Sequence, residues 1–237
     1  MQCARYMFTI LLLLLLLVNW GVEVLAMNTG FSTESLPKDD LNKFINNINI
    51  AMLSDEPQKK AIECFDVNEN GMVAIGCSDF EIKTVCIYTS DGDFQYGYSF
   101  ECSGNFGVEL VNSILYIYFV RSDVAIAVNP RGEVESILKI QNTSENNAYW
   151  NNCVFSNRRK IGDTEYTISN DMGIFNVFAS SYSQLIVTNR NGEESIIYDV
   201  SSAQFSSMVV AFVGVVAFAC LVLVVVIWQF VKLRRGA

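Results

Sequence analysis

The stretch Cys64–Glu101, CFDVNENGMVAIGCSDFEIKTVCIYTSDGDFQYGYSFE, decides the fold class of this chain. Short runs rich in β-branched and aromatic residues alternate in it with polar breaks, including Asn70-Gly71 and Asp91-Gly92. Asn-Gly and Asp-Gly provide the positive φ angles that tight hairpin turns require. The stretch therefore predicts four short antiparallel strands.

Two later stretches have the same layout. Gly132 and Gly192 stand where Gly92 stands in the first, 40 and then 60 residues further on, which leaves room for one additional loop. This spacing predicts four-stranded units at 60–102, 106–140 and 164–201. In the last unit, Asp171-Met172-Gly173 is expected to open the second strand.

Four antiparallel strands about every 40 residues resemble the blade of a β-propeller. The resemblance covers roughly Lys60–Ser201 and names no subfamily, because no Trp-Asp signature or paired glycines occur. It implies an all-β fold of three blade-like sheets, an open or partial propeller, since a closed ring takes about 4–8 blades. The alternative is an antiparallel sandwich whose meander repeats.

Three blades leave the end faces of the array exposed unless something covers them. A cap, a second copy of the chain or another protein would satisfy this need. In residues 27–59, Leu41, Phe44 and Ile48 share one helical face, so we expect a short amphipathic helix lying on the first blade.

Two apolar segments frame the repeat. Residues 1–26 have the pattern of a signal peptide, with Arg5 before an apolar core and a small-residue cleavage site; the alternative is an uncleaved anchor. Residues 208–231 carry no charge and reach about 36 Å as a helix, which is enough to span a membrane. The basic residues of the tail, 232–237, predict a cytoplasmic C-terminus and a single-pass protein of the cell membrane with its domain outside.

The inserted loop, residues 141–163, holds the candidate contact surface: Tyr149, Trp150, Arg158 and Arg159. Loops on rigid scaffolds often carry function, and these aromatic and basic side chains stand out in an acidic domain. The alternative is that the loop folds over an exposed blade face and its aromatic side chains are buried. Asn142 begins a glycosylation sequon.

Residues 27–207 contain 12 basic and 24 acidic residues, a net charge of −12. Such a charge argues against nucleic acid as a partner. The chain has no histidine, which excludes histidine-based triads and histidine-ligated metals. No phosphate-binding or dinucleotide-binding motif occurs either, so we expect no metal and no cofactor.

Residues 27–207 hold five cysteines, an odd number for an exported chain. Cysteine also behaves as a small buried apolar residue, and we expect that for most of them. If one disulfide forms, a bridge between Cys77 and Cys86 across a hairpin is the expected pair.

These patterns predict a membrane-anchored binding module without a catalytic site. Its partner would be a protein, including a second copy that completes the blade stack. One alternative is an accessory subunit of a membrane complex. Another is an extracellular glycan hydrolase that uses paired carboxylates, which requires two acids with separated pKa values in one cleft.

Overall fold

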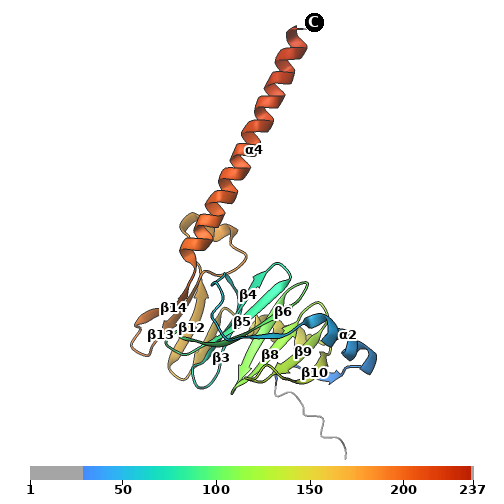
Figure 1. Ribbon diagram of the computed structural model, residues 1–237. Helices are drawn as coiled ribbons and strands as arrows, with labels where there is room; N and C mark the ends of the chain where they lie inside the picture. Colours follow the sequence, from blue (N-terminus) through green and yellow to red (C-terminus); the bar gives the residue numbers. More distant parts are fainter. Residues whose placement is uncertain (1–28, 236–237) are drawn as a thin grey trace, which may run out of the picture.

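The computed structural model describes residues 29–235, and the expected signal peptide at residues 1–26 lies outside them. The described chain is mostly β: three antiparallel sheets of four to five strands, followed by one long apolar helix (Figure 1). The strands are β1 Thr33–Ser35, β2 Ala51–Leu53, β3 Ile62–Val67, β4 Val73–Asp79, β5 Ile82–Tyr88, β6 Phe94–Glu101, β7 Phe106–Val111, β8 Ile114–Phe119, β9 Val124–Val128, β10 Val134–Ile140, β11 Arg158–Ile161, β12 Thr164–Ser169, β13 Gln184–Thr188 and β14 Glu194–Asp199. The helices are α2 Lys38–Ile48, α3 Ser144–Tyr149, the π-helix η1 Trp150–Val154, the 3-10 helix η2 Gly173–Phe178 and α4 Ser201–Arg235.

The first sheet has the order β2-β6-β5-β4-β3, the second β1-β10-β9-β8-β7 and the third β11-β12-β13-β14. The last turn of each meander contains one of the predicted glycines: Gly92, Gly132 and Gly192 have φ angles of 89°, 81° and 79°. In the second and third sheets, an asparagine three residues before the glycine accepts hydrogen bonds from the following backbone through its side-chain oxygen. Local turn chemistry therefore sets the strand boundaries, as the sequence predicted.

The first sheet lies between the other two. One apolar cluster joins one of its faces to the second sheet, through residues such as Tyr98, Phe100, Phe106 and Ile117. A second cluster joins its other face to the third sheet. Both faces of the first sheet are therefore buried, which explains the unbroken apolar runs Val73–Cys77 in β4 and Val85–Tyr88 in β5.

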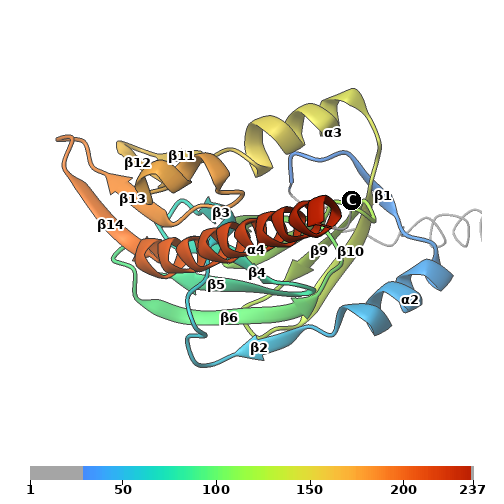
Figure 2. The ribbon, with the colours of Figure 1, turned by 90° about the horizontal axis from the view of Figure 1, so that it is seen from above.

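The three sheets form an open stack and do not close on themselves (Figure 1). The outer face of the second sheet is covered by α3 and η1, whose Trp150 and Val154 pack against Tyr118 together with Phe31. Figure 2 shows α3 along one side of the stack, and α2 and β2 along the other.

The third sheet differs from the expected unit. It begins at β11, inside the segment expected to be a loop, because Gly162 allows a tight turn into β12 with a φ angle of 58°. The expected second strand at Gly173 is wrong: Gly173–Phe178 forms η2 instead. The side-chain oxygen of Asn176 accepts the backbone N–H of Met172 at 2.8 Å, which closes a helical turn where the apolar pattern predicted a strand.

Residues 29–53 form a strap along the outer edges of the first two sheets. β1 pairs with β10 of the second sheet, β2 pairs with β6 of the first, and α2 lies between them. Helix α2 confirms the expected amphipathic helix, with Phe44 and Ile48 packed into the core between the two sheets rather than on the first sheet alone. It ends at Asn49, which adopts a left-handed conformation.

Helix α4 follows the third sheet directly. Only Val200 separates it from β14, and the N–H of Val200 donates to the carbonyl of Ser183 while its own carbonyl accepts the N–H of Gln204. Within α4, residues Ser201–Trp228 are long and apolar enough to cross a membrane, and none of the most apolar window is buried against the domain.

Candidate functional site

A groove of about 720 Å³ runs between α2 and β10. The helix contributes Leu41, Phe44, Ile45 and Ile48, and the strand contributes the five consecutive residues Val134–Leu138. Because side chains of a strand alternate between the two faces of its sheet, a groove on one face would be lined by alternate residues. Consecutive lining residues indicate that this groove follows the edge of β10.

The edge of β10 is only partly occupied. Strand β1 pairs with Leu138, Lys139 and Ile140, and no described strand pairs with Val134–Ile137 on that side. The N–H of Ile140 donates to the carbonyl of Asp123 on the β9 side. Since N–H directions alternate along a strand, the N–H of Ile137 points to the open side, into the groove.

Apolar side chains line this open edge. Ile45 is 47% exposed on the helix side and Val134 is 41% exposed on the strand side. Exposed strand edges are usually short, charged or covered. An unpaired backbone edge between apolar walls is suited to an extended peptide, whose backbone would extend the sheet while its side chains contact the walls.

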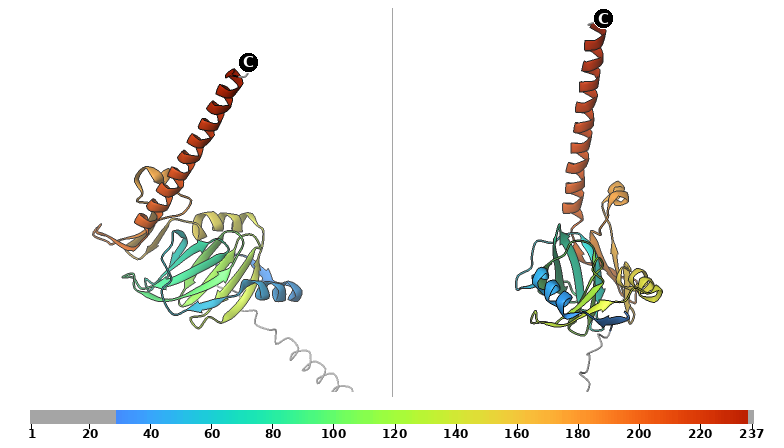
Figure 3. Two further views of the ribbon diagram at one scale, coloured as in Figure 1. Left: turned by 45° about the horizontal axis from the view of Figure 1, so that its top comes forward. Right: turned by 90° about the vertical axis from the view of Figure 1, so that its right-hand side faces the viewer.

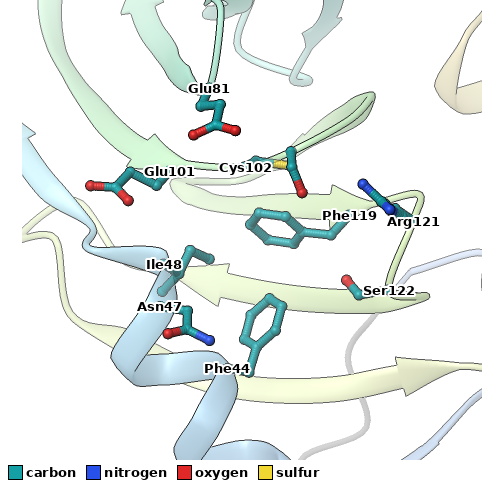
Figure 4. Close-up of a pocket in the computed structure, with 10 residues that line it drawn as sticks. Phe44, Asn47, Ile48, Glu81, Glu101, Cys102, Phe119, Arg121 and Ser122 are labelled. Atoms are coloured by element: carbon teal, nitrogen blue, oxygen red, sulfur yellow. The ribbon is translucent and has the colours of Figure 1, made fainter.

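A second, smaller cavity of about 350 Å³ lies on the other side of α2, between the ends of the first and second sheets. Phe44 and Phe119 meet there edge to face, with ring centroids 5.1 Å apart. Figure 4 shows their rings in the middle of the cavity, with Glu81 and Glu101 to one side and Arg121 to the other.

The residues that line the smaller cavity include the thiol of Cys102 and the carboxylate of Glu101. Burial raises the pKa of the Cys102 thiol, although Lys83 lowers it in part, so the thiol stays protonated at neutral pH. The side chain of Asn49 donates to Glu101 at 3.2 Å.

Two largely buried carboxylates, those of Asp66 and Glu109, lie where the first strands of the sheets meet. Burial raises the pKa of Asp66, against the opposing effect of the Arg159 guanidinium, and burial also raises the pKa of Glu109. Glu109 accepts hydrogen bonds from the phenols of Tyr118 and Tyr149. Neither carboxylate is among the residues that line the two cavities beside α2. The pair instead makes contacts between elements of the fold.

The expected contact residues are not gathered on one surface. Trp150 is 9% exposed and stacks on Phe155, and the hydroxyl of Tyr149 donates to Glu109. Arg159 is buried against Asp66, whereas Arg158 is exposed and pairs with Glu165. Trp150 is therefore buried, Tyr149 and Arg159 are partly buried and contact neighbouring elements, and Arg158 is exposed.

Cys77 and Cys86 are both buried free thiols, and the expected disulfide between them is not formed. In the ladder of β4 and β5, Cys77 faces Thr84 and Cys86 faces Ile75. The two cysteines are therefore diagonal neighbours, for which Cα separations of about 7–8 Å are usual and a disulfide is too short.

Sequence reasoning missed the groove. β1 and β2 have three residues each, too few for a strand period to appear in the sequence. The apolar stripe of α2 was the one usable signal, because it extends to Leu41 and Ile45, beyond the residues that enter the core.

Comparison of the chain with family models, with curated proteins and with solved structures gave no match.

Proposed function

We propose that this chain is a membrane-anchored binding module. Helix α4 crosses the membrane once, the β domain lies outside the cell, and the basic tail stays in the cytoplasm according to the positive-inside rule. The observation that carries the proposal is the apolar span of α4, which extends away from the three sheets (Figure 3) and whose most apolar window is not buried. Water would leave this apolar surface exposed, whereas lipid covers it.

The groove between α2 and β10 is the proposed binding site. Its ligand is an extended segment of a partner protein, which adds to β10 beside β1. Strand β1 supports this mode, because it already pairs antiparallel with the same edge through three residues. The ligand would continue along Val134–Ile137, with its apolar side chains against Ile45 and Val134.

The open stack supports an interpretation as an incomplete propeller. The first strands of all three sheets approach one another, since β3 contacts both β7 and β11. The outer face of the second sheet is covered by α3 and η1. A second copy that occupies the edge of β10 is the competing partner, and the experiment below separates the two.

Peptide selection tests the binding site. A library of random peptides of about six residues, the usual length of a strand, is selected on the full chain in lipid nanodiscs. Selected peptides are expected to alternate apolar and polar residues and to lose binding to the double variant Ile45→Asp, Val134→Asp. Both side chains are substantially exposed, so the substitutions leave the core intact. The matched control is Ile196→Asp, at an exposed position of β14 in the third sheet.

Equal binding to all three proteins, or a library without binders, would refute the groove as a peptide site. A dimer in sedimentation experiments that Val134→Asp dissociates would instead assign the edge to a second copy. The anchor is tested separately: carbonate-washed cell membranes should retain the full chain, and its recovery in the wash would refute the spanning helix.

A further inference from the structure

Helix η2, beside α4, carries three highly exposed apolar side chains. Ile174, Val177 and Phe178 are 81%, 86% and 76% exposed. No charged residue occurs between Met172 and Asn189, although the domain as a whole is acidic. Large apolar side chains grouped in an uncharged segment typically mark a contact with lipid or protein.

The segment is held in a defined shape. The side chain of Asn176 accepts the N–H of Met172 at 2.8 Å and donates to the carbonyl of Asn170 at 3.2 Å. At the base, the N–H of Asp171 donates to the hydroxyl of Ser183 at 3.0 Å. The polar side chain is thus used within the turn, and the apolar side chains of η2 are directed outward.

Phe175 fixes the position of η2 relative to α4. Its ring lies 5.5 Å from that of Phe205 and 6.2 Å from that of Phe212, in both cases edge to face. Figures 1 and 3 show the η2 segment standing out from the third sheet beside the first turns of α4. Phe212 is four residues beyond Met208, where the span expected from the sequence, residues 208–231, begins, and so lies about 6 Å further along the helix.

We propose that η2 inserts into the membrane interface next to α4, and that lipid covers Ile174, Val177 and Phe178. The inference rests on the proposed function, in that α4 must cross the membrane. Interfacial segments reach about 5–10 Å below the headgroup boundary, which matches the level of Phe212. Two attachments side by side, one spanning and one interfacial, would hold the third sheet at a fixed height above the bilayer.

The apolar side chains of η2 are covered by lipid rather than by protein in this proposal. Phe175 of η2 contacts Phe205 and Phe212 of α4, the helix that enters the bilayer, so η2 lies at the level of the membrane surface. A partner that covered η2 would have to lie at the level of the headgroups. No charged side chain of the segment opposes insertion, and apolar contact surface is the main source of interfacial affinity.

Photocrosslinking on the full chain tests the inference. p-Benzoylphenylalanine replaces Phe178, Phe212 or Ile45 in three separate proteins, each reconstituted in vesicles of phosphatidylcholine and phosphatidylglycerol. All three positions are exposed, so the label does not disturb the core. Residue 212 reports on α4, and residue 45 reports on α2, away from η2 in Figure 1.

Lipid adducts at residues 178 and 212, with none at residue 45, are the expected result. Adducts at residue 212 without adducts at residue 178 would overturn the insertion of η2 and leave the anchor intact. Crosslinks from residue 178 to protein would also overturn it, and would assign η2 to a protein contact. Absence of lipid adducts at residue 212 would overturn the spanning helix, and the inference with it.

Discussion

Nε of Arg159 lies 2.6 Å from Oδ1 of Asp66, although the two residues are 93 positions apart in the chain. The other carboxylate oxygen of Asp66 accepts the N–H of Leu110 at 2.7 Å. One carboxylate thus joins the first strand of the third sheet, β11, to the first strands of the other two sheets, β3 and β7. The side chains of Asp66 and Arg159 are only 13% and 14% exposed. If one of them were removed, water could therefore solvate the charge of the other only in part.

Arg159→Ala is expected to destabilise the domain by about 3–5 kcal/mol, because it leaves the charge of Asp66 buried and unpaired. Chemical unfolding of the full chain, followed by circular dichroism, measures the change. Arg158→Ala is the matched control: its side chain is 64% exposed, and the expected change is within about 0.5 kcal/mol. Equal effects of the two substitutions would show that Asp66 and Arg159 do not join the sheets.

The Glu109 carboxyl should give the domain a distinctive pH dependence. Burial raises the pKa of Glu109 in the folded domain above its ordinary value of 4.5. The folded state therefore holds this proton more tightly than the unfolded state does. The stability from Glu109 is fully present below pH 4.5 and is lost as the pH rises through the folded pKa.

Glu109→Gln isolates this contribution, because glutamine stays neutral at every pH. We expect the free energy of unfolding of the wild type, minus that of the variant, to fall as the pH rises above 4.5. Asp66 is present in both proteins, so its own titration largely cancels in the difference. Denaturant titrations of both proteins at a series of pH values measure the difference in the free energy of unfolding. A difference that rises with pH would contradict the prediction.

The buried cysteines should resist alkylation in the native protein. Burial raises the pKa of Cys77 to about 11 and that of Cys86 to about 12, so neither forms a thiolate at neutral pH. Iodoacetamide should label these two thiols only when the protein has been unfolded, in denaturant that contains no reductant. Peptide mass spectrometry detects the labelled residues. Cys153, which is partly exposed, serves as the internal control for native labelling. Failure to label Cys77 and Cys86 in the unfolded, unreduced chain would reveal a disulfide.

Trp150→Ala separates a packing role from a contact role for this residue. The indole packs against Phe31 and Tyr118 and stacks on Phe155. Its loss should cost about 3–5 kcal/mol of stability, as for other large-to-small core substitutions. Thermal unfolding followed by circular dichroism measures the loss. The control is the exposed neighbour Asn151→Ala, for which a change within about 0.5 kcal/mol is expected. If the Trp150→Ala protein were as stable as the wild type, Trp150 would again be a candidate for contact with a partner.

Features that depend on nearby residues could be predicted from the sequence. The Asn-Gly and Asp-Gly turns, the strands on either side of them and the apolar helix α4 are all set by local chemistry. Strand β11 could not be predicted, because its basic residues do not follow a strand pattern. Arg159 can be buried there only because Asp66 lies opposite, and that pairing is invisible until the sheets are stacked.

Helix η2 and the groove could not be predicted from the sequence. The apolar residues of η2 read as a strand, since the turn that Asn176 closes depends on one side-chain hydrogen bond. The groove arises where α2, from the N-terminal strap, meets β10, about ninety residues later in the chain. Neither segment by itself indicates that the edge of β10 is left open.

The single residue between β14 and α4 leaves no hinge. Both backbone groups of Val200 are hydrogen-bonded, to Ser183 and to Gln204, which ties the start of the helix to the third sheet. In the proposed membrane-spanning arrangement, a change in the tilt of α4 within the bilayer would move the opposite end of the domain, where the groove opens, through a wide arc. A force on a ligand in the proposed binding site would, in the same way, act as a torque on the helix.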